Sequence, residues 1–246
     1  MDEKEFDKII KGITLAFLDA TLGAPKAADM VSVMPLNREG ERQMKTSNKN
    51  VVERVDGIRG NYHAVRALEV ALAGGHSIAF VGCADSEGDV LASIAMDAGA
   101  KGYFIMPCPC GHFGSRSIKC SCSPAKIMRY RSGKKVKSRT FDDIQIEVNV
   151  PRPRDYTDTQ HGFKNAIIRI DKAKQFLPMV SGKLEPEPRR LLDRGIEALG
   201  FGPKTVDSVV SVSKTIAALD GSTETRSSHV AEAIQYKMFN RGELRT

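Results

Sequence analysis

Two short apolar runs separated by about twenty residues constrain the fold of this chain most strongly. The first run, 78–81 (Ile-Ala-Phe-Val), ends at Gly82, and the second covers 103–106 (Tyr-Phe-Ile-Met). A helix-like stretch over about 89–98 lies between them. A crossover between two parallel strands needs at least about 10–12 residues, so the interval holds one helix and nothing more. The pattern predicts a βαβ unit and therefore an α/β fold with a parallel sheet.

The turn after the first run has the shape of a phosphate-binding loop without its phosphate chemistry. A strand, Gly82 and a following helix reproduce the order of the motif G-x-x-x-x-G-K-[ST], which holds phosphate with backbone N–H groups, a Lys and a hydroxyl. Gly88 and Asp89 stand where the Lys and the hydroxyl belong, and residues 85–89 (Asp-Ser-Glu-Gly-Asp) crowd three carboxylates together. Gly82, Ser86 and Gly88 keep only the backbone shape. We expect weak nucleotide binding at most, and the alternative is an ordinary acidic turn.

Positive charge is concentrated in one segment, 126–139. The chain has 37 basic and 30 acidic side chains, a net charge of +7, and this segment contains seven basic residues and no acidic one. The seven are Lys126, Arg129, Arg131, Lys134, Lys135, Lys137 and Arg139. Such a cluster is typical of nucleic-acid binding, and Tyr130 within it can stack on a base. The alternative is a solvated surface loop.

Four of the five cysteines fall within 108–122 as two C-x-C pairs, Cys108 with Cys110 and Cys120 with Cys122. An odd total of five cysteines, four of them clustered, indicates a metal site or reduced thiols and not a secreted disulfide framework. Four thiolates predict bound Zn²⁺, with His112 as a substitute ligand. The alternative is a tight turn with reduced cysteines.

The rest of the chain is organised around this centre. Residues 2–20 carry an amphipathic helical pattern, and 36–54 are polar and aperiodic, which indicates a surface linker. An alternating pattern predicts a strand over 144–150, and from about residue 160 the chain predicts three or four helices. No apolar run approaches about 18 residues and the N-terminus is acidic, so we expect no membrane span, no secretion signal and a cytoplasmic location.

Four segments, in this order, resemble one family, the magnesium-chelatase-like AAA+ ATPases of the ComM or YifB type. They are 55–76 with the strand into Gly82; PCPCG at 107–111 with CSCSPAKIMRYRS at 120–132; DIQIEVNVPRP at 143–153; and the helical stretches 184–201, 212–222 and 229–241. The resemblance implies a small AAA+-like parallel-sheet core followed by an all-helical lid. It divides the chain into an N-terminal helix and linker (1–54), a reduced core with a cysteine-rich basic insertion (55–156) and the lid (157–246).

The departures from this family concern its ATPase residues. The span that would hold the Walker B strand is missing before Tyr103, and the remaining key positions carry other residues: Gly88 and Asp89 in the loop, Met106 for the sensor Asn, Phe141 near the arginine finger, and Lys204 and Ser208 for lid arginines. Because phosphoryl transfer depends on positioning and charge stabilisation, we expect no ATP hydrolysis.

These features predict an adaptor that binds nucleic acid or a partner protein, including a partner in an AAA+ ring. One alternative is an ATP-binding ATPase or helicase-type subunit of a ring that another chain completes. Another is a homo-oligomer assembled through residues 2–20.

Overall fold

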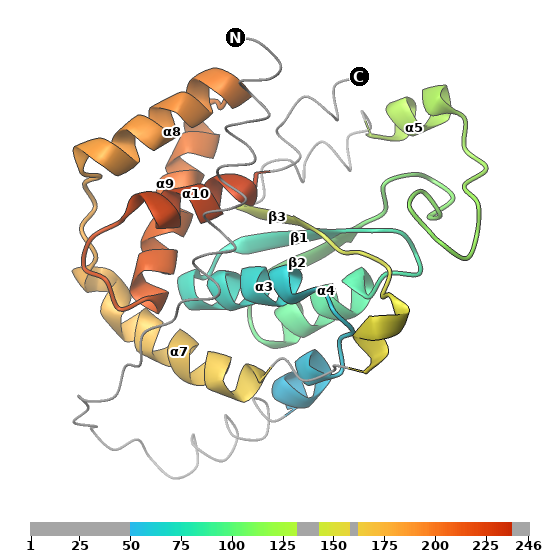
Figure 1. Cartoon of the computed structure of the whole chain (residues 1–246), viewed down its shortest axis with the longest axis horizontal. Coiled ribbons are helices and arrows are strands. Elements are labelled where there is room, and N and C mark those ends of the chain that lie inside the picture. The colour runs from blue at the N-terminus through green and yellow to red at the C-terminus, as the bar shows by residue number, and fades with distance from the viewer. Residues whose placement is uncertain (1–49, 132–142, 158–161, 238–246) are drawn as a thin grey trace.

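The computed structural model describes residues 50–131, 143–157 and 162–237 (Figure 1). Its centre is a parallel sheet of three strands, β1 (Ser77–Val81), β2 (Lys101–Ile105) and β3 (Ile144–Glu147), in the order β2-β1-β3. The middle strand β1 is apolar and its three central residues are buried, as expected for a strand covered on both faces. The predicted α/β class and the βαβ unit are confirmed.

Two helices pack against this sheet. Helix α4 (Gly88–Asp97) is the crossover between β1 and β2 and contacts both strands. Helix α3 (Tyr62–Gly74) contacts β1 and β3 and lies next to α4 (Figure 1). It ends at Gly75, which has a left-handed backbone and donates its N–H to the Ala71 carbonyl, a conformation that glycine adopts without strain.

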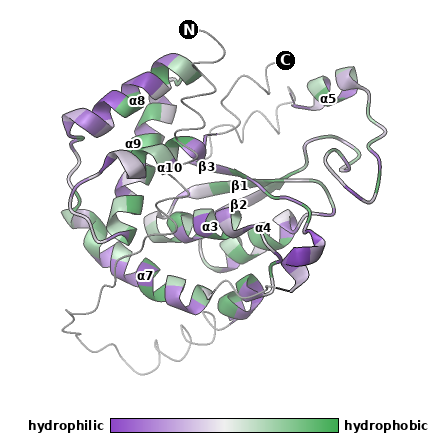
Figure 2. Cartoon of the chain, viewed as in Figure 1, coloured by the Kyte–Doolittle hydropathy of each residue, from purple (hydrophilic) through white to green (hydrophobic). Residues whose placement is uncertain are grey.

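The region after residue 162 is helical, as predicted. It contains α7 (Phe163–Phe176), α8 (Pro186–Leu199), α9 (Pro203–Leu219) and α10 (Ser227–Gln235), with a 3-10 turn at Leu177–Met179. Helices α7 and α9 pack on α3, and α10 packs on α8 and α9. Helix α8 is largely hydrophilic (Figure 2), and its buried residues are Pro188 and Leu192. The helices therefore share one buried core with the sheet.

Residues 50–56 differ from the sequence expectation, because they are helical where the polar linker was expected to continue to residue 54. Val51 and Val55, spaced one helical turn apart, are buried in the core. Arg54 also pairs with Asp97 of α4 and donates to Ser93. The predicted helix 2–20 and residues 36–49 of the predicted linker lie outside the described residues.

The predicted strand over 144–150 is shorter in the structure, since β3 ends at Glu147. Val148 still donates its N–H to the Val81 carbonyl at 2.8 Å. A short 3-10 helix, Pro153–Tyr156, follows. Within the described ranges, no helix combines the length and the apolar character needed to cross a bilayer.

Candidate metal centre and basic surface

The four clustered cysteines meet in space. The chain leaves β2, turns at Gly111 and returns with Cys120 and Cys122 just before α5 (Pro124–Arg131). All four sulfur atoms lie within 4.8 Å of one another. The Sγ–Sγ distances are 3.4 Å for Cys108 and Cys110, 3.7 Å for Cys108 and Cys120, and 3.5 Å for Cys110 and Cys120. We call residues 107–123 the knuckle.

These distances fit a metal centre and exclude disulfides. Four thiolates at about 2.3 Å from a tetrahedral Zn²⁺ place their sulfur atoms about 3.8 Å apart, whereas a disulfide needs about 2.05 Å. The Phe113 N–H donates to Cys108 Sγ at 3.3 Å, which orients that sulfur. His112 is not part of the cluster. The four cysteines can hold a metal ion.

The thiols are electrostatically unequal. Hydrogen bonds from the backbone of His112 and of Ser121 outweigh desolvation and lower the pKa of Cys110 to about 5. The Cys122 backbone favours the Cys120 thiolate, but desolvation and the neighbouring sulfur atoms raise the pKa of Cys120 to about 12. Desolvation and the hydrogen bond to Cys110 also raise the pKa of Cys122. At neutral pH a metal ion must therefore displace protons from Cys120 and Cys122.

The knuckle rests on the loop after β1, the one that resembles a phosphate loop. Ala84 donates its N–H to the Gly111 carbonyl at 2.8 Å. The Asp85 carboxylate accepts hydrogen bonds from the Ser115 and Ser117 hydroxyls, and these bonds lower the pKa of Asp85. One of the three carboxylates that the sequence places in this loop therefore anchors the knuckle.

The interior of that loop is filled by its own contacts. Ser86 is buried and donates both its N–H and its hydroxyl to the Cys83 carbonyl, at 3.0 and 2.7 Å. Gly82 donates to the Ile105 carbonyl at 3.1 Å, and Glu87 accepts from the Arg59 N–H at 2.6 Å. The backbone N–H groups of Gly82, Ala84 and Ser86 are thus bonded to protein carbonyls and do not point to a ligand.

Gly82 and Gly88 are held by close packing. A Cβ atom on Gly82 would lie 2.3 Å from the Ser86 hydroxyl, and one on Gly88 would lie 2.5 Å from the Phe104 ring. The position where the family resemblance expects Lys therefore has no room for a side chain unless Phe104 moves.

Lys204 is not brought to this loop. It lies on α9 one turn before Ser208, whose hydroxyl donates to Asp143 Oδ1 at 2.8 Å. Asp143 Oδ2 accepts from the Ser77 N–H at 3.1 Å, at the start of β1. Gly82 follows the other end of that strand, about 16 Å from Ser77. Figure 1 likewise shows α9 at the end of the sheet opposite to the loops that follow β1 and β2.

Helix α5 carries the described part of the basic segment, namely Lys126, Arg129, Tyr130 and Arg131. None of its residues is buried. Arg131 donates from Nε to the Pro107 carbonyl at 3.1 Å and its guanidinium lies 5.1 Å from the centre of the Phe113 ring. Lys134, Lys135, Lys137 and Arg139 lie outside the described residues.

Tyr130 is half-buried, and it lies close enough to the cysteine cluster for Cys108 to influence it. Desolvation and the nearby Cys108 raise its pKa. The sequence pattern predicted that this ring stacks on a base, and in the structure part of the ring is buried near the knuckle.

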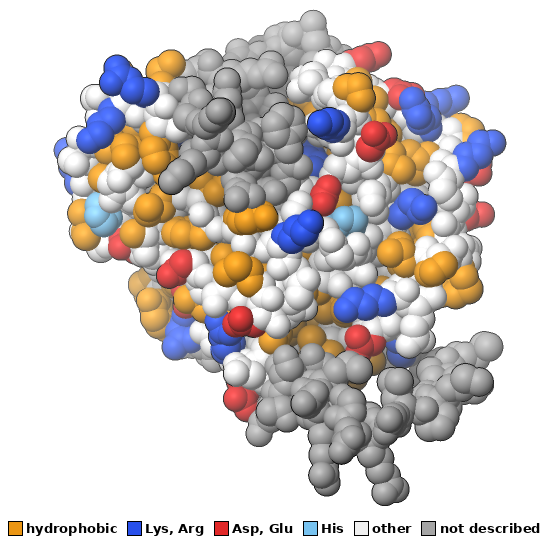
Figure 3. Space-filling model, turned by 180° about the vertical axis from the view of Figure 1, so that it is seen from behind, with side chains coloured by type: hydrophobic (Ala, Val, Ile, Leu, Met, Phe, Trp, Pro, Cys, Tyr) orange, Lys and Arg blue, Asp and Glu red, His pale blue; other side chains and the backbone are white. Residues whose placement is uncertain are grey.

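Two cationic residues of this surface escaped the sequence reasoning. Arg116 and Lys119 are exposed on the knuckle between the cysteine pairs. The signal was present, since no acidic residue occurs between Asp97 and Asp142. Exposed apolar side chains, Phe113, Ile118 and Met128, lie on the same segments. Figure 3 views the molecule from behind, and at the upper left, where α5 projects, Lys and Arg side chains lie beside hydrophobic ones with no acidic side chain among them.

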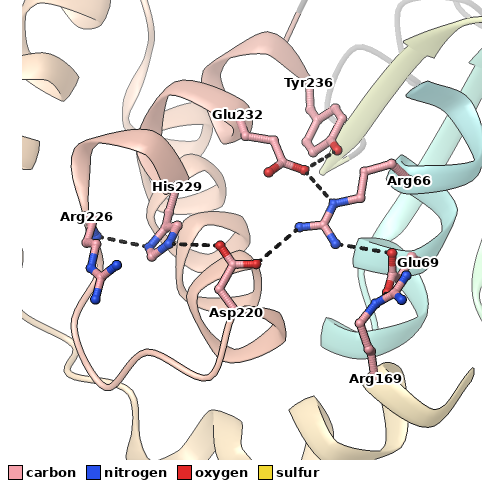
Figure 4. Close-up of polar contacts among 8 residues, drawn as sticks. All are labelled: Arg66, Glu69, Arg169, Asp220, Arg226, His229, Glu232 and Tyr236. Carbon is pink, nitrogen blue, oxygen red and sulfur yellow. Dashed lines mark hydrogen bonds and ion pairs between the residues drawn. The ribbon is translucent and has the colours of Figure 1, made fainter. Parts of the chain in front are cut away.

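A separate charged network joins α3 to the C-terminal helices (Figure 4). Arg66 of α3 donates to Glu69 and to Glu232 of α10, each at 3.1 Å, and Arg169 of α7 donates to Glu69 at 2.7 Å. Glu69 is buried, so its two arginine partners compensate its desolvation. We infer a structural role, because each charge is turned toward a partner within the fold.

The same network includes a histidine. His229 Nε2 lies 3.2 Å from Asp220, and His229 Nδ1 accepts the Arg226 N–H at 3.0 Å. Hydrogen bonding with His229 and the charge of Arg66 outweigh the desolvation of Asp220 and lower its pKa. These contacts link the turn after α9 to α10.

A second buried chain of polar groups lies at the start of the sheet. The Lys237 ammonium is buried and donates to the Ser208 hydroxyl at 2.9 Å, which in turn donates to Asp143. Residues 236 and 237 also run beside β3, where Gln145 donates its N–H to the Tyr236 carbonyl. This chain fixes α9 and the end of α10 to the sheet.

Two family models match the sequence. "Magnesium chelatase, subunit ChlI" matches residues 103–157, and "Magnesium chelatase, subunit ChlI C-terminal" matches residues 144–237. The first match covers β2, the knuckle, α5 and β3, and the second covers β3 and the helices after it. A search of curated proteins found no match.

Proposed function

The chain belongs to the magnesium-chelatase family, and on that premise we propose that it is a member without ATP hydrolysis that binds nucleic acid through a metal-ordered basic surface. The observation that carries this proposal is the attachment of the knuckle to the loop after β1. The loop that would cradle phosphate is closed by its own hydrogen bonds, and its Asp85 anchors the cysteine segment that presents α5.

The absence of hydrolysis is supported by packing as well as by residue type. Phosphoryl transfer depends on fixed donors and cations around the phosphates. Gly88 faces the Phe104 ring with no space for a Lys, and Asp89 replaces the hydroxyl that would bind Mg²⁺. Lys204 lies at the other end of β1.

Zinc is the metal that the donor set favours. Cys108, Cys110, Cys120 and Cys122 supply four soft thiolate ligands with tetrahedral spacing. Four protein ligands leave no open position for water or substrate, so the ion would order the knuckle and would not perform catalysis.

Nucleic acid is the partner that the surface chemistry favours. The described cations Arg116, Lys119, Lys126 and Arg129 lie on the knuckle and α5, on segments without a carboxylate. Each cation that neutralises a phosphate releases a counterion, so the affinity should fall steeply as salt rises. Exposed Phe113 and Met128 offer apolar contact to bases.

Binding of a labelled single-stranded DNA oligonucleotide, followed by fluorescence anisotropy at several salt concentrations, tests the proposal. The variant Lys126→Gln with Arg129→Gln should bind about tenfold more weakly and should reduce the salt slope by about 1.4. Lys164→Gln with Lys172→Gln, which removes two exposed cations of α7, is the matched control. Equal losses in both pairs would show that only net charge matters.

Nucleotide is tested in parallel by thermal shift and by phosphate release with Mg²⁺ and ATP. The proposal predicts neither stabilisation nor turnover. Stabilisation by ATP would favour the alternative, a subunit of an ATPase ring that another chain completes. Metal-dependent turnover by the isolated chain would contradict the proposal.

A further inference from the structure

Within the described residues, helix α5 contributes no side chain to the buried core. None of its eight residues is buried, and a helix of this length is not stable alone in water. Several of its contacts are with the knuckle: Arg131 bonds the Pro107 carbonyl and stacks on Phe113, and the Ile127 N–H bonds the Ser123 carbonyl at 3.0 Å. The position of α5 therefore follows the position of the knuckle.

The two arms of the knuckle are anchored differently. The outgoing arm continues from β2 and bonds the loop after β1 through Gly111, Ser115 and Ser117. The returning arm, which carries Cys120 and Cys122 into α5, meets the outgoing arm at sulfur atoms 3.5–3.7 Å apart. Thiols form only weak hydrogen bonds, whereas a metal ion would join the arms by four coordinate bonds.

We propose that metal occupancy of the four-cysteine knuckle switches nucleic-acid binding on by fixing α5, and that metal loss switches it off. This inference rests on the proposed function and adds its regulation. In the loaded state Arg116, Lys119, Lys126 and Arg129 have fixed spacing. In the metal-free state the returning arm and α5 separate from the outgoing arm, and the cations must be ordered again at each binding event.

Loss of zinc changes both the charge of the knuckle and the order of α5, and these two changes have opposite effects on nucleic-acid affinity. A Zn²⁺ ion with four thiolates has a net charge of −2, whereas metal-free cysteines regain protons and become less negative. Electrostatics alone would therefore strengthen nucleic-acid binding when zinc leaves, by about twofold per charge at about 10 Å in water. Loss of order should weaken binding by about tenfold or more, because the competent arrangement becomes a minor state. Ordering should therefore dominate.

The test uses the full chain loaded with Zn²⁺, treated with a chelator under reducing conditions, and then reloaded. Anisotropy with a labelled single-stranded DNA oligonucleotide should show about tenfold weaker binding after chelation and recovery after reloading. The variant Cys122→Ser should bind weakly before and after Zn²⁺ addition. Ser228→Ala, at an exposed serine of α10 outside the knuckle, is the control and should behave as the unmodified chain.

Amide hydrogen exchange gives an independent readout. Chelation should raise exchange in residues 120–131 and leave α3 unchanged, which separates local release of α5 from global unfolding. Equal or tighter DNA binding without zinc, or failure of the chain to bind zinc, would overturn the switch while leaving the basic surface intact. Failure of the zinc-loaded chain to bind DNA would instead overturn the proposed function.

Discussion

Single residues decide what the loop after β1 can hold. Gly88 packs against the Phe104 ring, Ser86 fills the loop interior, and Asp85 bonds two serines of the knuckle. These contacts make the loop a structural support, so restoring individual side chains of the phosphate motif would disturb this packing without recreating a phosphate site.

Substitution of Gly88 tests this packing. Gly88→Ala should lower the free energy of unfolding by about 1–3 kcal/mol, because the added Cβ would lie 2.5 Å from the Phe104 ring. Gly182→Ala, whose Cβ meets only the Lys214 ammonium at 3.7 Å, should change stability by less than about 0.5 kcal/mol. Urea denaturation of both variants measures the difference. Equal stability would show that the loop has room at residue 88.

Rebuilding the motif should not restore catalysis. The triple variant Glu87→Gly, Gly88→Lys and Asp89→Thr should release no phosphate from ATP with Mg²⁺, because it restores the motif without the missing groups that position water and stabilise charge. Recovery of ATP turnover would show that the loop substitutions alone account for the absence of hydrolysis.

His76 should make stability depend on pH. It is buried, its Nε2 lies 2.8 Å from the Thr215 hydroxyl, and burial lowers its pKa below 6.5. The unfolded chain therefore takes up a proton at a higher pH than the folded chain, and stability falls as pH decreases through about 6.5. His76→Gln should show a smaller loss between pH 7.5 and 5.5 in urea denaturation. An unchanged pH slope would assign the effect to other groups.

At the scale of elements, the local sequence pattern was sufficient to predict helices and strands wherever the apolar residues were periodic or formed a continuous run. The apolar runs at 78–81 and 103–106 predicted β1 and β2, and the helical stripes predicted the C-terminal helices. The helix at 50–56 was missed, because a run of five polar residues, 45–49, precedes it and its apolar contacts to the core are long-range. The place of Lys204 could not be read from the sequence, because α9 docks at the start of β1 through Ser208 and Asp143.

The cysteine site was likewise predictable from local sequence in part only. Their spacing predicted a metal cluster, and the structure brings all four sulfur atoms together. The role of Asp85 was not predictable, because its serine partners are about thirty residues away and carry no motif.

Zinc affinity of the knuckle should depend steeply on pH. Cys110 has a pKa of about 5, whereas Cys120, with a pKa of about 12, and Cys122, with a raised pKa, are protonated at neutral pH. Binding must release at least two protons, so the apparent affinity should rise by about two log units per pH unit between pH 6.5 and 7.5. Competition with a chromophoric chelator measures this slope. A flat profile would contradict a four-thiolate site.

At the scale of the whole molecule, buried charges connect the helices to the sheet. Arg66 joins α3 to α10 and to Asp220, and Glu69 joins α3 to α7. A second chain from Lys237 through Ser208 to Asp143 joins α9 and the end of α10 to β1 and β3. The helices after residue 162 are therefore held at two places, to α3 by the first network and to the sheet by the second.

Arg66 should contribute more to stability than a surface ion pair. Arg66→Met should lower the free energy of unfolding by about 2–4 kcal/mol, since it leaves the buried Glu69 with one partner fewer. Arg54→Met, which removes the exposed pair with Asp97, should cost less than about 1 kcal/mol. Urea denaturation at neutral pH compares them, and equal costs would show that the network adds little.

The central claim is that the molecule binds nucleic acid without using nucleotide. The most direct measurement is the anisotropy isotherm of the zinc-loaded chain for a labelled single-stranded DNA oligonucleotide, with and without Mg²⁺ and ATP. We predict two superimposable isotherms whose common affinity falls steeply with salt. Absence of binding, or an isotherm that shifts when ATP is added, would contradict the account.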